Sequence, residues 1–473
     1  INNPHTFFHF PILSRGNLIA SIAAAIALGS GIVYVRLFHV PQMPTLDPDK
    51  WWGIGAKPRE QDTSIRHFTL DFNDTMITDL KQRLRNRRPF TKPLEGIQSE
   101  YGINTIYLDK VLTYWIEKYD FKKRAESLNR FPHYKTRIQG LDIHFIRVKP
   151  ELKTKAEKDL KVLPLLMLHG WPSSSKEFDK VIPILTSPRK GFDFVFEVVA
   201  ADLPGFGYSE GTNKPGLSPA HIGIMMRNLM KRLGFDKFFI QAGDWGSQCA
   251  THLATLYPED VLGFHTNMPI SSRLVSTAKL LVGSFFPRLM DSHHERMYPL
   301  MKVFREIVRE SGYFHIQATK PDTIGVPLTD SPAGLAAYLM EKMAICSSRD
   351  QLDTPHGGLE NLNIDDVLDT VTIMWANNCV VTATRIYAEG VGAIRTEVHT
   401  LHNIPTKVPT AAAKFRYEVT YQSDWMLKDK FPNLVRSTVY DFGGHFAALQ
   451  TPQVLVDDIF EATVAFLKFH KKK

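Results

Sequence analysis

The stretch Ala242-Gly243-Asp244-Trp245-Gly246 decides the fold, because it predicts a tight turn between a strand and a helix. The apolar run at residues 238–240 precedes it and predicts a short strand ending at Gly243. A sharp strand-to-helix turn requires small residues two positions before and two after its centre, which is the pattern of a nucleophile elbow. The central Asp244 would lie at a helix N-terminus, where the helix dipole stabilises negative charge. The alternative interpretation is an ordinary N-cap, a position at which Asp is common.

The chain on both sides of this turn alternates between strands and helices. Residues 162–168 and 196–201 are nearly continuous apolar runs, as in strands buried on both faces of a parallel sheet. Residues 218–234 have apolar side chains at helical spacing and close on a glycine. Near the C-terminus, residues 435–442 predict a strand and residues 454–469 a helix. This alternation predicts an open α/β sheet.

Two further loops carry the residues that would complete a site around Asp244. His169-Gly170-Trp171-Pro172 follows the strand at 162–168, and Gly443-Gly444-His445-Phe446 follows the last strand. Around a nucleophile elbow, the first of these loops and the residue after the nucleophile donate backbone N–H groups to an oxyanion hole, here those of Trp171 and Trp245. The chain order nucleophile, acid, histidine makes His445 the expected base.

The acid that orients His445 should follow the strand before it. Glu418 comes after a predicted strand at residues 406–417 and precedes His445 by 27 residues. We expect Glu418 to be this acid, and Asp424 is the alternative.

A carboxylate nucleophile restricts the reaction class. It can displace a leaving group from an alkyl carbon and form an ester, which water activated by His445 then hydrolyses. The substrate is then an epoxide, whose oxygen would need tyrosine hydroxyl donors, or an alkyl halide, for which the Trp245 indole would serve. A haloalkane dehalogenase-like hydrolase is therefore one alternative, and a non-catalytic protein that binds lipophilic ligands is another. Candidate tyrosines in the strand-poor segment between about residues 268 and 397 are Tyr298, Tyr313, Tyr338 and Tyr387.

The N-terminal region contains a run of 20 residues without charge, at positions 16–35. As a helix it would measure about 30 Å, the thickness of a bilayer's hydrocarbon core. We expect a membrane anchor, with a cleaved signal peptide or a buried soluble helix as alternatives. Residues 64–130 have helical signals, and the alternation around Gln139-Gly140 predicts a hairpin.

The composition excludes several other classes. The 473 residues include 57 Lys and Arg against 49 Asp and Glu, and the resulting charge of +8 is spread along the chain rather than clustered as in nucleic-acid-binding proteins. Apolar residues make up 44% of the chain, which excludes a largely disordered protein. Three widely spaced cysteines exclude a disulfide framework and a zinc ribbon. We therefore expect no metal, no cofactor and no nucleic-acid partner.

The sequence resembles the microsomal epoxide hydrolase family from about Trp51 to the last predicted helix. Individually the elbow and the His-Gly loop are shared by many hydrolases, whereas a string in the strand-poor segment is far more specific. The motifs that carry the resemblance are Trp51-Trp52-Gly53, Ser64-Ile65-Arg66, Leu141-Asp142-Ile143-His144-Phe145, His169-Gly170-Trp171-Pro172, Gly243-Asp244-Trp245-Gly246, Glu310-Ser311-Gly312-Tyr313, Thr319-Lys320-Pro321-Asp322-Thr323 and Gly443-Gly444-His445-Phe446-Ala447-Ala448.

The resemblance implies an α/β-hydrolase fold with a helical lid, in which Asp244 is the nucleophile, His445 the base and Glu418 its acid. It also implies that Tyr313 and Tyr387 polarise an epoxide oxygen. The implied organisation is an N-terminal segment with the membrane helix (1–40), a meander (41–150), the first part of the core (151–270), the lid (271–395) and the second part of the core (396–473).

The family is anchored in the endoplasmic reticulum membrane, so the resemblance implies this location, and the charges flanking the anchor faintly favour a cytosolic catalytic body. The partners expected are a small lipophilic epoxide, water and the membrane. The chain looks similar to an insect sub-class that hydrolyses juvenile hormone, a sesquiterpenoid epoxide ester.

Overall fold

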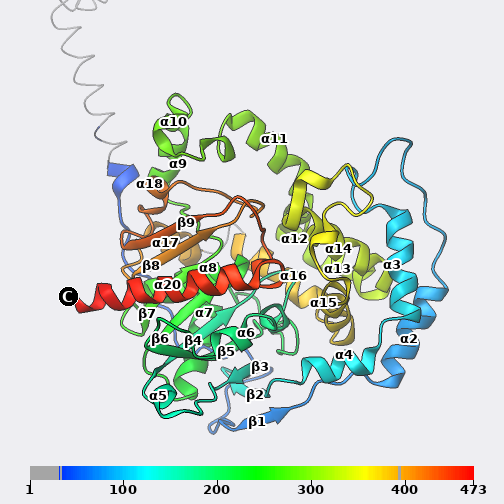
Figure 1. Cartoon of the computed structure of the whole chain (residues 1–473), viewed down its shortest axis with the longest axis horizontal. Coiled ribbons are helices and arrows are strands. Elements are labelled where there is room, and N and C mark those ends of the chain that lie inside the picture. Colours follow the sequence, from blue (N-terminus) through cyan, green and yellow to red (C-terminus); the bar gives the residue numbers. More distant parts are fainter. Residues whose placement is uncertain (1–30, 32–34, 392–395, 473) are drawn as a thin grey trace, which may run out of the picture.

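A nine-stranded mixed sheet forms the centre of the computed structural model, which describes residues 31, 35–391 and 396–472 (Figure 1). The strand order is β1-β2-β3-β5-β4-β6-β7-β8-β9. The pairs β1–β2, β2–β3 and β3–β5 are antiparallel. All the remaining pairs, from β5 through β4, β6, β7 and β8 to β9, are parallel. The strands are β1 (Ile65–Phe68), β2 (His133–Ile138), β3 (Leu141–Val148), β4 (Lys161–Leu168), β5 (Phe194–Ala201), β6 (Phe238–Ala242), β7 (Val261–Thr266), β8 (Thr410–Lys414) and β9 (Leu434–Val439).

The parallel half confirms the strand and helix pattern predicted from the apolar runs. Every residue of β5 is buried, as expected for a strand with neighbours on both sides and helices on both faces. The predicted hairpin is also present, because β2 and β3 pair across Gln139 and Gly140. Both turn residues have positive φ, +49° and +91°, the combination that a two-residue hairpin turn matching the strand twist requires.

Helices cover both faces of the parallel half. One face packs against α6 (Ile182–Leu185), α19 (Ala447–Gln450) and α20 (Pro452–Lys471), the last of which crosses the sheet in red in Figure 1. The other face packs against α7 (Pro219–Arg232) and α8 (Asp244–Leu256), and α17 (Thr396–Asn403) contacts these two helices. The sheet therefore holds the ends of its parallel strands, and the loops that follow them, in fixed positions.

The N-terminal region adds three helices, α2 (Asp74–Arg85), α3 (Thr105–Glu117) and α4 (Phe121–Leu128). Each begins at an Asn or Asp whose side chain accepts a backbone N–H of the first turn. The helical prediction for residues 64–130 was wrong for β1, which has no alternating pattern of its own. Its four residues are mostly exposed, and they are extended because they pair with β2 at the edge of the sheet.

Between β7 and β8, the described residues form helices and turns and contain no strand. The helices are α9 (Leu274–Gly283), α10 (Pro287–Met290), η2 (His294–Arg296), α11 (Leu300–Glu310), α12 (Gly312–Thr319), α13 (Pro321–Asp330), α14 (Pro332–Ser348), η3 (Arg349–Gln351), η4 (Leu359–Asn361), α15 (Ile364–Ala376), α16 (Val380–Val391) and then α17. Figure 1 shows α2 and α3 at the right, on the same side as α13, α14 and α15 and away from the sheet. Short helices elsewhere are α5 (Lys155–Lys158), η1 (Ser175–Phe178) and α18 (Asp424–Leu427).

Within the described residues, no helix is both long enough and apolar enough to cross a bilayer. The predicted membrane helix at residues 16–35 falls outside that description except for Gly31 and Val35.

Candidate active site

The elbow sequence forms the turn that its small residues predict. Asp244 is the first residue of α8 and has a φ of +48°, one of only three positive values at non-glycine residues in the described chain. A Cβ on Gly246 would lie 2.4 Å from the carbonyl oxygen of His169, so no larger side chain fits there. The N-cap position is occupied by Gly243, without a side-chain cap. Asp244 is therefore not the ordinary N-cap of the alternative interpretation, and its carboxylate is available to other groups.

The loop after β4 supplies a hydrogen bond to that carboxylate. The backbone N–H of Trp171 donates to Asp244 Oδ1 at 2.7 Å. This approach depends on Gly170, because a Cβ at that position would lie 2.1 Å from the same oxygen. Trp245, the other predicted donor, is the second residue of α8, and its ring lies edge-on to that of Tyr387 with centroids 4.9 Å apart.

His445 lies between two carboxylates. Its Nε2 is 3.4 Å from Asp244 Oδ2, and its Nδ1 is 2.5 Å from Glu418 Oε1. The loops that carry His445 and Glu418 are joined by a parallel bridge between Tyr417 and Gly444. Burial lowers the pKa of His445, but the nearby negative charges of Glu418 and Asp244 outweigh it and hold this pKa well above its usual value. The raised pKa favours the protonated imidazole in the free site.

Asp424, the alternative acid, lies elsewhere. Its Oδ1 accepts hydrogen bonds from Lys414 Nζ at 2.9 Å and from Ser437 Oγ at 2.7 Å. These contacts join α18 to β8 and β9, whereas the carboxylate partners of His445 are Glu418 and Asp244. The structure therefore brings together Asp244, His445 and Glu418 and leaves Asp424 out.

Three of the four candidate tyrosines, Tyr313, Tyr338 and Tyr387, contact the indole of Trp171. Tyr313, from α12, stacks on this indole with ring centroids 5.3 Å apart, and Tyr387, from α16, meets it edge-on at 5.9 Å. Burial raises the pKa of Tyr313 and of Tyr387 well above the usual value, so both hydroxyls keep their protons. The hydroxyl of Tyr338 accepts a hydrogen bond from Gln317 at 3.2 Å. The hydroxyl of Tyr298 donates to the carbonyl of Leu280, so Tyr298 is not part of the group around Trp171.

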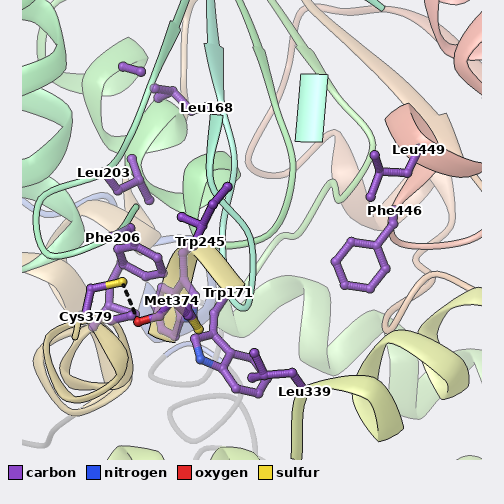
Figure 2. Packing of buried hydrophobic residues seen from close by; sticks show 14 of the residues in the cluster. Leu168, Trp171, Leu203, Phe206, Trp245, Leu339, Met374, Cys379, Phe446 and Leu449 are labelled. Atoms are coloured by element: carbon purple, nitrogen blue, oxygen red, sulfur yellow. Dashed lines mark hydrogen bonds between the residues drawn. The ribbon is translucent and has the colours of Figure 1, made fainter. Parts of the chain in front are cut away.

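Buried apolar side chains surround this group. Figure 2 shows Trp171 and Trp245 in one buried cluster with Leu339 of α14 and Met374 of α15, and with Phe446 beyond them. Such surroundings suit a substrate with little polar surface and lower the local dielectric, which strengthens the electrostatic interactions of the carboxylates.

The sequence reasoning missed a buried ionic cluster next to the site. Lys176 of η1, five residues after Trp171, contacts Asp366 Oδ1 at 2.6 Å and Asp369 Oδ2 at 3.4 Å, both on α15. Asp369 also accepts from Tyr119 at 2.8 Å and pairs with Arg124 of α4. Burial lowers the pKa of Lys176, but the two aspartates outweigh it and the pKa is raised. The loop that carries Lys176 also contains three serines and Glu177, so no sequence signal indicated that this lysine is buried.

The sequence reasoning also missed Glu177, which follows Lys176. Burial raises the pKa of Glu177 to about 7, and its neighbouring charges include His445, Asp244 and Glu418. A third carboxyl group therefore adjoins the site and shares its electrostatic field.

Comparisons with known proteins identify sequences and structures that are similar to this chain. A family model described as "Epoxide hydrolase N terminus" matches residues 65–178, and one described as "alpha/beta hydrolase fold" matches residues 164–294. The juvenile hormone epoxide hydrolase of Manduca sexta is 69% identical over 460 residues, which cover 96% of this chain and 98% of that protein. Epoxide hydrolase 1 of Sus scrofa is 40% identical over 420 residues, which cover 87% of this chain and 91% of that protein.

Among solved structures, the crystal structure of juvenile hormone epoxide hydrolase from the silkworm Bombyx mori superposes with a TM-score of 0.86 at 40% identity. The match covers 90% of this chain and all of that one. The sheet and the helices on its two faces thus have the α/β-hydrolase fold.

Proposed function

Given that this chain belongs to the epoxide hydrolase family and is an epoxide hydrolase, we propose that it opens a lipophilic epoxide through a covalent ester on Asp244. The observation that supports this route best is that the two oxygens of that carboxylate have different partners. Oδ1 accepts the N–H of Trp171, whereas Oδ2 faces the imidazole of His445. Oδ2 is then the attacking atom, and Oδ1 already occupies the position at which negative charge develops later.

In the first step, Asp244 Oδ2 attacks a ring carbon of the epoxide. The carbon–oxygen bond of the ring breaks and its electron pair stays on the oxygen. Tyr313 and Tyr387 are the expected donors to this oxygen, and one of them gives it a proton. The raised pKa values of both hydroxyls support this role, because a donor must hold its proton until the alkoxide forms.

Formation of the ester prepares His445 for the second step. The ester removes the negative charge of Asp244, which lowers the pKa of His445. The proton released by His445 passes through solvent and restores the tyrosine. His445 is then neutral, with Nδ1–H held by Glu418, and can accept a proton from water.

In the second step, the activated water attacks Cγ of the Asp244 ester. Oδ1 becomes the oxyanion; it already accepts the N–H of Trp171, and the N–H of Trp245 is the second expected donor. Collapse of this intermediate breaks the Cγ–Oδ2 bond, and His445 gives the proton that it took from water to the departing oxygen, which releases the diol. The proton of the new carboxyl group then passes to His445, so that the Asp244 carboxylate and the imidazolium are restored. The sum of the two steps is epoxide plus water giving a vicinal diol.

We propose juvenile hormone as the substrate, because relatives that cover nearly the whole chain are named for it. The aromatic and aliphatic side chains around Trp171 suit a sesquiterpenoid chain. Turnover of juvenile hormone compared with an aryl epoxide and a simple alkyl epoxide tests this point. A lower kcat/KM for juvenile hormone than for both other substrates would contradict it.

We also propose the remaining parts of the organisation expected from the sequence. Residues 271–395 would act as a lid over Asp244, residues 41–150 as a meander that braces the lid, and residues 16–35 as an anchor in the endoplasmic reticulum membrane, with the body in the cytosol. Contacts between α14 and α2 support the bracing. Membrane fractionation of cells expressing the full chain tests the anchor, and recovery in the soluble fraction would contradict it.

The central test uses the variant His445→Gln, which can form the ester but cannot activate water. Mixed with an epoxide, it should gain the mass of one substrate on the peptide that contains Asp244. The variant Asp424→Asn is the matched control and should turn over without accumulating an adduct. Absence of added mass on the Asp244 peptide would contradict the covalent route, and halide release from a chloroalkane with the epoxide left intact would favour the dehalogenase alternative.

A further inference from the structure

Helix α11 has an apolar side that the fold leaves exposed. Leu300, Val303, Phe304, Ile307 and Val308 recur at the spacing that places side chains on one side of a helix. A helix of a globular protein normally packs such a stripe against the core. No residue of α11 is buried, and Phe304 and Val308 are 57% and 59% exposed.

The preceding helices have the same property. Leu281 and Val282 at the end of α9, Phe285 and Phe286 in the connection, and Leu289 of α10 are all exposed. Phe285 is 79% exposed and Leu289 is 83% exposed, which is unusual for side chains of this size. We refer to these residues together with Met301, Phe304, Ile307 and Val308 as the α9–α11 apolar surface. Exposed apolar residues gathered in one segment mark an interaction site rather than normal surface.

We propose that the α9–α11 apolar surface lies in the interfacial layer of a lipid bilayer and forms a second membrane contact. The amphipathic pattern of α11 fits this partner, because Lys302, Arg305 and Arg309 occupy the side opposite the apolar stripe. Segment 274–310 as a whole has six Lys or Arg residues against four Asp or Glu residues, a mildly basic balance that suits anionic lipid headgroups.

The position of the surface in the molecule supports the same partner. In Figure 1, α10 and α11 project from the upper edge of the body, and the first described residues, in blue, lie toward the left of the same upper part of the view. Val35 and Phe38 there are 63% and 51% exposed. Val35 is the last of the 20 uncharged residues at positions 16–35, and Phe38 follows shortly after it. A membrane reached by that segment would thus lie on the side of the molecule where the α9–α11 apolar surface is exposed, so this inference rests on the membrane association proposed above.

The test uses the full chain with a single introduced cysteine that carries an environment-sensitive fluorophore. The native cysteines, Cys249, Cys346 and Cys379, are buried, so the label should attach to Phe285→Cys or Phe304→Cys. Ile106→Cys on α3 is the matched control, since Ile106 is 51% exposed and belongs to a different part of the molecule. The labelled chains are mixed with vesicles of phosphatidylcholine and phosphatidylserine, with and without a nitroxide on the acyl chains.

We expect the labels at positions 285 and 304 to brighten several-fold on vesicles and to be quenched by the nitroxide lipid, because an interfacial helix lies about 5–10 Å into the headgroup and acyl boundary. The label at position 106 should show neither change. A label on Leu289→Cys should no longer brighten on vesicles when Phe285→Asp and Phe304→Asp are introduced together. Hydrolysis of a small soluble epoxide by this variant should be unchanged.

Co-sedimentation with vesicles and brightening of the labels distinguish the second membrane contact from the N-terminal anchor. Co-sedimentation of the chain with vesicles while the labels at 285 and 304 stay in water would overturn the second contact and leave the anchor standing. No co-sedimentation would overturn both. Brightening that depends on protein concentration and occurs without vesicles would show that a second copy of the chain covers this surface, which also overturns the proposal.

Discussion

The loop that contains Trp171 and Lys176 contributes to two clusters of buried charges. The two clusters differ in how completely their charges are paired. In the ionic cluster, Lys176 and Arg124 meet Asp366 and Asp369, and no buried polar atom of these four residues lacks a hydrogen-bond partner. Burial raises the pKa of Asp366, but the lysines beside it outweigh this and lower it to about 2.

In the candidate active site, by contrast, one imidazole serves two carboxylates. Glu418 Oε2 is buried without a hydrogen-bond partner, and Asp244 has one oxygen held by Trp171 and the other facing His445. We call a cluster closed when every buried charge has its partners, and open when a buried charge lacks one. A closed cluster fixes structural elements relative to one another, whereas an open cluster can exchange protons and accept a substrate. Burial of charge by itself therefore does not distinguish a catalytic site from an ion cluster that only joins structural elements.

The largest effect is expected for Asp244→Ala, which removes the nucleophile from the open cluster. We expect diol formation to fall by about 10⁴-fold or more in kcat/KM, because no other group can form the ester. Product assay by chromatography checks this. The variant's thermal unfolding should match that of the wild-type chain, and activity within about tenfold of wild type would show that Asp244 is not the nucleophile.

The next effect is expected in the closed cluster. Asp369→Asn leaves Lys176 and Arg124 with one partner too few, so the free energy of unfolding should fall by about 3–5 kcal/mol. Urea unfolding measures this change, and kcat per folded molecule should stay close to the wild-type value. Asp330→Asn is the control, because its carboxylate pairs with Arg83 on the surface with 82% of the side chain exposed, and should cost under about 1 kcal/mol. Equal losses in the two variants would contradict the bracing role.

A smaller effect is expected for Glu418→Gln, which opens the catalytic cluster further. We expect kcat to fall by about 10²-fold, because His445 loses the group that orients it. Loss of the Glu418 charge lowers the pKa of His445, so neutral imidazole persists to lower pH. The acidic limb of the kcat–pH profile should therefore move to lower pH. A limb that moves to higher pH would contradict this assignment, and Asp424→Asn should leave the profile unchanged.

The smallest effect is expected for Tyr387→Phe, because Tyr313 still donates to the epoxide oxygen. We expect a loss of about tenfold in kcat/KM, and a much larger loss when Tyr313→Phe is added. Stopped-flow measurement of the ester-forming step should show that this step is the one slowed. Tyr298→Phe is the control, since its hydroxyl donates to the Leu280 carbonyl. A double variant no worse than the single one would show that the two hydroxyls do not act on the same oxygen.

Part of the fold and of the candidate site could be predicted because it depends on short-range geometry. The elbow around Asp244 follows from the steric demands of one turn, and the strand runs and the helix at α7 follow from their periodicity. The strand β1 could not be predicted, because pairing with β2 across about 70 residues makes it extended. The choice between Glu418 and Asp424 was also open, since both follow the same strand.

The sequence by itself determined the carboxylate at an elbow, the loop that donates to it and the histidine after the last strand. Only the tertiary structure decided which acid meets His445, which tyrosines meet Trp171, and that Lys176 joins α15 and α4 in a closed cluster. The physical reason is the range of the interactions. Turn sterics and side-chain periodicity act within a few residues, whereas contacts such as Tyr119 with Asp369 join residues 250 positions apart and exist only once the sheet has brought them together.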